Sequence, residues 1–232
     1  MKKCVVICAA VLINAASLGA AARVATSRPA TRPAPGPTQA SLIAQADKHE
    51  SAGQYALAAK YARAALAGAG KRGLKSISRI RKQLRRLALR LSSARRLEAM
   101  SAALAKRPED IAIRERIIKL CVVELDNPTM ALKFINEDVD QILQTYVPLA
   151  AGKLSKIGEA SCRELAAWYA SHLDKTSPVG KIAMLRRVAA CCDRFLQLHK
   201  SVDDEHRHAT QQRQSAVRSL AEMGETFTKD SN

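Results

Sequence analysis

Aromatic residues are scarce in this sequence, which has one Trp, four Tyr and three Phe among 232 residues. Proteins that hold single-stranded nucleic acid stack its bases on aromatic side chains, so this scarcity argues against nucleic acid as a partner. The chain is nevertheless strongly basic, with 38 Lys and Arg against 21 Asp and Glu and a formal net charge of +17. Such a charge favours acidic partners of another kind, such as an anionic membrane face or an acidic polymer.

Enzyme signatures are also lacking. The sequence contains no GxxxxGK, GxSxG, HExxH or GxGxxG motif, the patterns that mark phosphate-binding loops, serine hydrolases, zinc proteases and dinucleotide-binding folds. Its paired carboxylates, Glu124 with Asp126 and Glu137 and Asp138 with Asp140, lie at the predicted ends of helices, where capping accounts for them. We therefore expect a non-catalytic protein without catalytic residues or a cofactor. An enzyme that lacks recognisable motifs stays open as an alternative.

No CxxC pair occurs, which argues against a zinc ribbon or a thiol-redox site. Four of the six cysteines lie beyond the N-terminal region, at helical positions typical of core residues: Cys121, Cys162, Cys191 and Cys192. If 159–173 and 178–198 pair as a helical hairpin, Cys162 comes opposite Cys191 and Cys192. A disulfide between Cys162 and Cys192, or Cys191 in its place, is therefore a hypothesis, although helices in contact meet the required Cβ separation of about 4 Å only occasionally.

The histidines do not predict a metal site. His206 and His208 are two residues apart, and on a helix they point about 200° apart, so they cannot share an ion. His172 and His199 lie near opposite ends of the predicted hairpin and are expected on the surface. We therefore predict no metal ligand.

The first 22 residues have the pattern of a secretory signal peptide. Lys2 and Lys3 precede an uncharged apolar run over 4–21, and the alanines that end at Ala22 are the small residues that a signal peptidase reads. We expect cleavage after Ala22 and export to the periplasm or cell envelope; an uncleaved membrane anchor is the alternative. Residues 23–39 contain four prolines and are predicted to form an extended linker.

Residues 40–225 are predicted to form one all-α domain, followed by a disordered tail at 226–232. Apolar residues recur at helical spacing, and Gly and Pro mark the breaks. The expected helices are 40–51, 55–67, one that starts near 74, 109–125, 129–136, one that ends near 147, 159–173, 178–198 and 202–223. In the helix from 74, the apolar spacing slips after Ala94, which predicts a bend or a change of packing partner near Arg95.

Between Lys71 and Arg96 the chain has eleven Lys or Arg and no Asp or Glu. On a helix, four of these share one side and two lie beside them, and we call these six the basic ridge: Arg79, Lys82, Arg86, Arg90, Arg81 and Arg85. The ridge could hold an acidic protein, anionic lipid or a phosphate-bearing polymer. The alternative is a face that is only solvated, or one that pairs with acids of neighbouring helices such as Glu109, Asp110 and Glu115.

The alanine-rich stretch from 52 to 66 suits two helices in close contact, because small side chains let their backbones approach. Its residues Ala52-Gly53-Gln54-Tyr55, Ala58-Ala59, Tyr61 and Ala65-Leu66 resemble a tetratricopeptide repeat. Further along, Pro108-Glu109-Asp110 and Trp168-Tyr169 are similar to an uncharacterised group of exported bacterial helix-hairpin domains. These resemblances imply an array of α-α hairpins, a short solenoid with a polar C-terminal capping helix at 202–223, that acts as a scaffold without known chemistry.

Together these expectations predict a non-catalytic scaffold of the bacterial cell envelope that binds a partner protein or peptide. A basic module that binds anionic lipid or cell-wall polymer is the alternative. The sequence predicts neither the partner's identity nor an oligomeric state.

Overall fold

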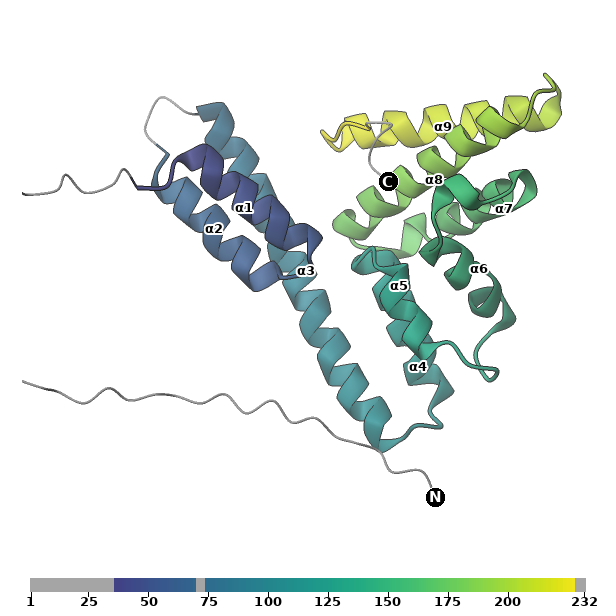
Figure 1. Cartoon of the computed structure of the whole chain (residues 1–232), viewed down its shortest axis with the longest axis horizontal. Coiled ribbons are helices and arrows are strands. Elements are labelled where there is room, and N and C mark those ends of the chain that lie inside the picture. Colours follow the sequence, from purple (N-terminus) through teal and green to yellow (C-terminus); the bar gives the residue numbers. More distant parts are fainter. Residues whose placement is uncertain (1–35, 70–73, 228–232) are drawn as a thin grey trace, which may run out of the picture. The chain divides into compact units, whose positions relative to one another are not determined.

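The computed structural model describes residues 36–69 and 74–227, and every regular element in these ranges is a helix (Figure 1). The all-α prediction is therefore confirmed for this part of the chain. The predicted signal peptide at 1–22 and the linker as far as residue 35 lie outside the described residues. The α-helices are α1 (Gln39–Ser51), α2 (Tyr55–Ala67), α3 (Leu74–Lys106), α4 (Ile111–Lys119), α5 (Pro128–Ala131), α6 (Gln141–Ala151), α7 (Glu159–Ala170), α8 (Pro178–Leu198) and α9 (Asp204–Glu222).

The helices α1 and α2 form a hairpin that packs against the first half of α3 (Figure 1). Gly53 lies between them with φ of 72°, a left-handed conformation that a residue without Cβ adopts freely. The side chains of Ala46, Ala58, Ala62 and Ala65 are fully buried, so the small residues do face the helix contacts, as the alanine pattern predicts. These small side chains allow the backbones of the neighbouring helices to approach closely.

One unbroken helix, α3, serves two hydrophobic cores. Its residues from Ile80 to Ala94 pack with α1 and α2, whereas Met100 and Leu104 pack with the helices that follow. Leu97 contacts both clusters. The predicted change of packing partner near Arg95 is therefore confirmed, and it occurs without an interruption of the helix.

The next helix begins two residues later than predicted. Asp110 is the N-cap of α4, where its carboxylate accepts a hydrogen bond from the backbone N–H of Ile113, and Pro108 lies in the preceding turn. The helix continues past Lys119 as a π-helix, η1 (Leu120–Glu124). Its backbone hydrogen bonds span one residue more than those of an α-helix, so it changes the direction of the side chains that follow.

The carboxylates at helix ends act partly as capping predicts. Asp140 is the N-cap of α6 and accepts from the N–H of Ile142. Glu124 instead serves the start of another helix, since it accepts from the N–H of Ser177 at 3.0 Å and from Thr176 Oγ1 at 3.2 Å, just before α8. Glu124 therefore ties the end of η1 to the N-terminus of α8.

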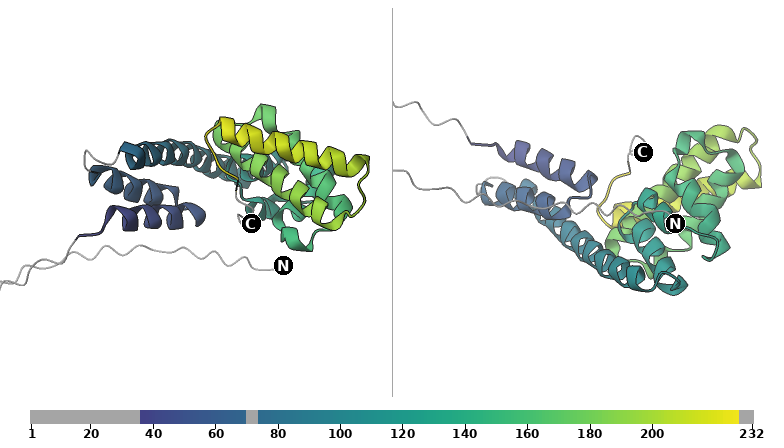
Figure 2. Two further views of the ribbon diagram at one scale, coloured as in Figure 1. Left: turned by 90° about the horizontal axis from the view of Figure 1, so that it is seen from above. Right: turned by 60° about the horizontal axis from the view of Figure 1, so that its bottom comes forward.

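Helix α8 is the centre of the larger core, with α7 against one side and α9 against another (Figure 2). The predicted hairpin of α7 and α8 is therefore confirmed. The polar helix α9 buries only Ala209, Ala216 and Leu220. Phe227 packs against the same core, so the packed chain extends beyond residue 225, where the predicted tail was to begin. Two short 3₁₀ turns, η3 (Leu154–Lys156) and η4 (Leu173–Lys175), flank α7, and a third, η2 (Leu132–Phe134), follows α5.

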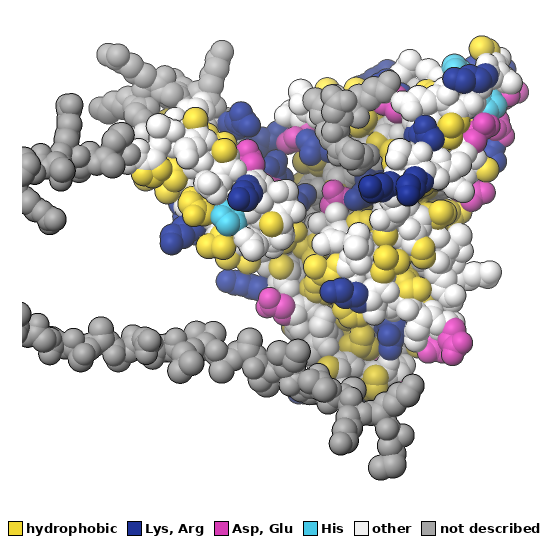
Figure 3. All heavy atoms as spheres, in the orientation of Figure 1, with side chains coloured by type: hydrophobic (Ala, Val, Ile, Leu, Met, Phe, Trp, Pro, Cys, Tyr) yellow, Lys and Arg dark blue, Asp and Glu magenta, His cyan; other side chains and the backbone are white. Residues whose placement is uncertain are grey.

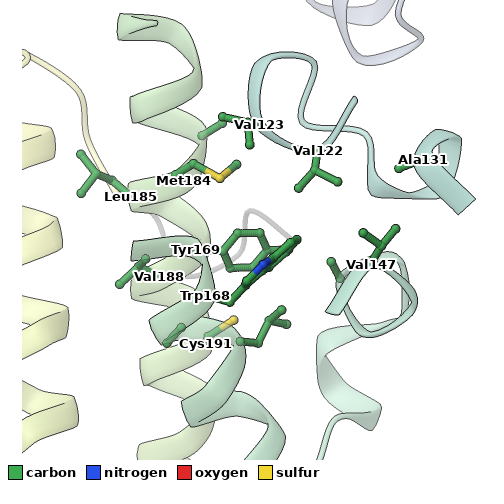
Figure 4. Packing of buried hydrophobic residues seen from close by; sticks show 14 of the residues in the cluster. Val122, Val123, Ala131, Val147, Trp168, Tyr169, Met184, Leu185, Val188 and Cys191 are labelled. Atoms are coloured by element: carbon green, nitrogen blue, oxygen red, sulfur yellow. The ribbon is translucent and has the colours of Figure 1, made fainter. Parts of the chain in front are cut away.

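The aromatic pair of α7 lies inside this core. Figure 4 shows the rings of Trp168 and Tyr169 side by side, with Val147 of α6 and Cys191 of α8 near them. The ring of Tyr146 stacks on Trp168 with 5.4 Å between ring centroids. The few aromatic residues of the chain are thus used largely for packing.

Among the described residues, no helix combines the length and the apolar character needed to cross a membrane.

Candidate functional site

Two arginines of the basic ridge form contacts with a buried acid of the same protein. Arg86 donates from Nε and Nη2 to the two carboxylate oxygens of Glu50, at 2.8 and 2.9 Å. Arg90 has an Nη1 3.8 Å from the same carboxylate, and its guanidinium lies over the ring of Tyr55. Glu50 belongs to α1 and is buried. The alternative interpretation, pairing with acids of neighbouring helices, therefore holds for these two residues, with Glu50 in place of the acids that were expected.

We predict that Glu50→Gln lowers the free energy of unfolding by about 2 kcal/mol, because it leaves two partly buried guanidinium groups without their carboxylate. Chemical denaturation of both proteins measures the difference. The control is Glu98→Gln, an exposed acid of the same helix that carries the ridge, which should change stability by less than about 0.5 kcal/mol. Equal effects of the two substitutions would contradict a structural role for Glu50.

The remaining ridge residues differ in their surroundings. Lys82 pairs with Glu225 at 2.9 Å and donates to the carbonyl oxygen of Gly224. Within the described residues, Arg79, Arg81 and Arg85 are exposed and form no ion pair. An anionic partner at the ridge therefore stays a prediction, and it concerns these three residues.

The four described cysteines are free and buried in this structure. The thiol of Cys162 donates to the carbonyl oxygen of Ile157, and that of Cys192 donates to Gln212 of α9. Cys162 of α7 lies in the same hydrophobic core cluster as Cys191 and Cys192 of α8. The hairpin thus brings the hypothesised partners into one region, but the Cys162–Cys192 disulfide is not formed.

His199 is not the free surface residue that the sequence predicts. Its Nδ1 lies 2.7 Å from Glu159 and its Nε2 2.9 Å from Asp203, and the side chain is 11% exposed. Ligand atoms of Glu159, His199 and Glu205 lie within 4.8 Å of one another, a spacing that a metal ion could bridge. Glu159 already pairs with His199, however, and Glu205 pairs with Arg163. We therefore interpret the cluster as ion pairs that join α7, α8 and α9.

Hydrogen bonds to Glu159 and Asp203 raise the pKa of His199 above its ordinary value of 6.5. A raised pKa stabilises the fold at pH values below 6.5, and this stabilisation is lost as the pH rises through the pKa of the folded state. We expect His199→Gln to lower the melting temperature most near pH ~5.5 and least near pH ~8.5. A difference that stays constant over this range would contradict the prediction.

A cavity of about 550 Å³ opens between the end of η1, α5, the connection from α6 to η3, and helices α7 and α8. We call it the Arg187 cavity. Its polar and titratable lining residues include Asp126, Asn127, Thr129, Lys153, Tyr169 and Arg187. Its volume is within the range of small-molecule sites.

Backbone irregularities form one wall of the Arg187 cavity. The π-helix η1 ends at Glu124, and Asp126 then has φ of 53°, a left-handed conformation that is unfavourable for a residue with a Cβ. The N–H of Asn127 closes this turn on the carbonyl oxygen of Cys121 at 2.9 Å. π-helices and strained backbone both occur often at functional sites. In this protein, the end of η1 and the left-handed conformation of Asp126 direct the Asp126 carboxylate toward Arg187 of α8.

The ion pair of this wall holds Arg187 against an aromatic ring. Arg187 Nε donates to Asp126 Oδ1 at 2.5 Å, Nη1 donates to the Tyr169 hydroxyl at 3.4 Å, and the guanidinium carbon lies 5.6 Å from the Tyr169 ring centroid. Burial raises the pKa of Tyr169, and it raises the pKa of the neighbouring Cys191 to about 12. Both groups therefore stay protonated at neutral pH, and Cys191 is not a reactive thiolate.

A second hollow, of about 450 Å³, lies between α7, α8 and α9. We call it the α8–α9 groove. Its apolar lining residues are Ala170, Leu173, Leu185, Val188 and Ala216, and Asp174 and Lys181 line it as well. From α9 come polar side chains spaced three and four residues apart: His208, Gln211, Gln212, Ser215 and Ser219. The groove thus has an apolar floor and a rim of side chains that can donate and accept hydrogen bonds.

The main residues of the Arg187 cavity were not predicted from the sequence. Asp126 was assigned only to a helix end, and Arg187 was not singled out. A signal was available, because Arg187 lies within an apolar helical stretch, where a buried cation requires an acidic partner. Which acid would meet it could not be read from the sequence, since Asp126 is 61 residues away.

No protein-family model matches the chain, and no match was found among curated proteins or among solved structures.

Proposed function

We propose that this protein is a non-catalytic scaffold of the bacterial cell envelope that binds a partner protein or peptide in the α8–α9 groove. The observation that carries the proposal is the groove itself, where an apolar floor lies beside a row of amide and hydroxyl groups on α9. An apolar floor can bury side chains of a peptide, and amide groups can pair with its backbone. The location in the envelope rests on the signal-like pattern of residues 1–22.

The helix packing supports an array of tetratricopeptide-like hairpins. Consecutive helices pack against each other in α1–α2–α3 and again in α7–α8–α9, the neighbour-to-neighbour arrangement of such arrays. The proposed absence of catalysis is consistent with the Arg187 cavity, where the carboxylate of Asp126 is already ion-paired and the Cys191 thiol is protonated.

A site-specific photo-crosslinker tests the peptide groove. The full chain would carry the crosslinking residue at Gln211, which lines the groove, or at Gln214, an exposed residue of α9 outside it. We expect a partner adduct in envelope extract at position 211 and not at 214. A Ser215→Trp substitution, which fills the groove, should abolish the adduct, whereas Arg218→Trp should not. Equal crosslinking at both positions, or none at either, would refute the groove as the binding site.

The outer face of α3 favours a second candidate, a module that binds anionic lipid or cell-wall polymer. Arg81 and Arg85 are exposed there, and Leu89, four residues further along, is 43% exposed. On the face drawn in Figure 3, which is the side of α1 and α2, Lys and Arg side chains are interspersed with Asp, Glu and apolar side chains. Binding to anionic vesicles that is lost at high salt and in the double variant Arg81→Glu, Arg85→Glu would favour this candidate.

A further inference from the structure

The Arg187 cavity has an excess of positive charge and of hydrogen-bond donors. Among its described lining residues, Arg187 and Lys153 are cations and Asp126 is the carboxylate. Lys153 is exposed and forms no ion pair within the described residues. The lining therefore has one positive charge in excess, which favours an anionic ligand.

Arg187 retains donors that the protein does not use. A guanidinium group has five N–H donors, and the described residues provide acceptors for two of them, one on Asp126 and one at 3.4 Å on Tyr169. The Nη2 of Arg187 is not among the buried polar atoms that lack a partner. It is therefore not fully buried, and Asp126 acts as a positioning residue that holds the guanidinium through Nε.

Tyr169 adds another donor at the same place. Its hydroxyl oxygen accepts from Arg187, and within the described part of the chain its own O–H has no acceptor. Burial raises its pKa, so the proton stays on the ring at neutral pH. A carboxylate beside this pair would receive hydrogen bonds from both the guanidinium and the phenol.

The rest of the lining is mixed. Asn127, Thr129 and Ser155 are polar, and the apolar residues are Pro128, Leu149, Ala150, Leu154, Ile157 and Leu165. An anionic ligand with an apolar body can bury that body against these apolar side chains. A carboxylate fits the single excess charge, whereas a phosphate monoester, with a charge of about −1.5 to −2 at neutral pH, would exceed it.

We propose that the Arg187 cavity binds a small monocarboxylic acid with an apolar body, whose carboxylate lies against Arg187, Tyr169 and Lys153. This is a ligand site additional to the peptide groove, which lies on other residues of α8 and on α9. A negative result for the acid site would therefore leave the peptide groove untouched, and a negative result for the groove would leave the acid site untouched.

Calorimetry on the full-length protein tests the ligand chemistry. The three probes, octanoate, octyl phosphate and octan-1-ol, each have eight carbon atoms and differ in the polar group. We expect octanoate to bind at least about tenfold more tightly than octan-1-ol, since one charge-assisted hydrogen bond contributes about that factor. We also expect octanoate to bind more tightly than octyl phosphate. Equal binding of octanoate and octan-1-ol, preference for octyl phosphate, or no binding of octanoate would overturn the proposal.

Matched variants test the residues. Arg187→Gln should weaken octanoate binding at least about tenfold, whereas Arg186→Gln, which removes the neighbouring arginine that pairs with Glu225 outside the cavity, should leave it unchanged. Lys153→Gln should weaken binding severalfold without affecting folding, because Lys153 is exposed. If Arg187→Gln proves unstable, the Lys153→Gln result decides, and unchanged affinity in that variant would refute the assignment.

Discussion

Replacing Gly180 by Ala is expected to lower the free energy of unfolding by about 2 to 3 kcal/mol, the cost of an overpacked helix contact. Gly180 is in the first turn of α8, pressed against the end of η1. A Cβ there would lie 2.0 Å from Thr176 Oγ1 and 2.9 Å from the carbonyl oxygen of Val123. The threonine side chain can rotate away, but the carbonyl belongs to the π-helix, so the two helices must separate.

Chemical denaturation of the two proteins measures this loss. The matched control is Gly68→Ala at the C-terminal end of α2, where a Cβ would meet nothing closer than 3.6 Å and φ is −80°. That substitution should change stability by less than about 0.5 kcal/mol. If Gly180→Ala were equally mild, the close contact between α8 and η1 would be refuted.

Replacing Arg187 by Met is expected to lower the free energy of unfolding by about 2 kcal/mol, because Asp126 then loses the partner that compensates its desolvation. The full cost of breaking a buried pair would be larger, but the side chains of Arg187 and Asp126 are 22% and 32% exposed, so water partly screens the remaining charge.

The same substitution should be much milder in a protein that already carries Asp126→Gly. Glycine accepts the φ of 53° at this position without strain and removes the carboxylate. A double-mutant cycle measured by denaturation should therefore give a coupling of at least about 1 kcal/mol between the two positions. Additive effects would mean that the ion pair does not stabilise this wall of the cavity.

The helices could be predicted from the sequence because their signals are local. The ends of α1 and α2 differ from the predicted ends by at most one residue, since Gly53 and the alanine spacing determine them nearby. The slip in apolar spacing after Ala94 likewise indicated where α3 exchanges one core for another. The π-helix has no such signal, because Leu120 to Glu124 continues the apolar pattern of α4. Its contacts with α8 are tertiary and do not show in the local sequence.

The residues of the Arg187 cavity could not be predicted, because they meet only through tertiary contacts. The Asp126–Arg187 pair joins residues far apart in the sequence, and the conformation of Asp126 follows from the end of η1. The basic ridge illustrates the same limit. Its helical face was predictable from spacing, but the partners of Arg86 and Lys82 are Glu50 and Glu225, which lie outside the acids near 109–140 that the sequence suggested.

The uninterrupted course of α3 through two cores has a consequence for insertions and deletions. One residue added or removed near Arg95 would rotate everything beyond it by about 100° around the helix axis. The side chains of Met100 and Leu104 would then leave their core while Ile80 and Leu87 kept theirs. A seven-residue insertion, which returns the helix to within about 20° of its original phase, would preserve both faces. Length changes at this point therefore preserve both faces only when they keep the helical phase, as insertions of about seven or eleven residues do.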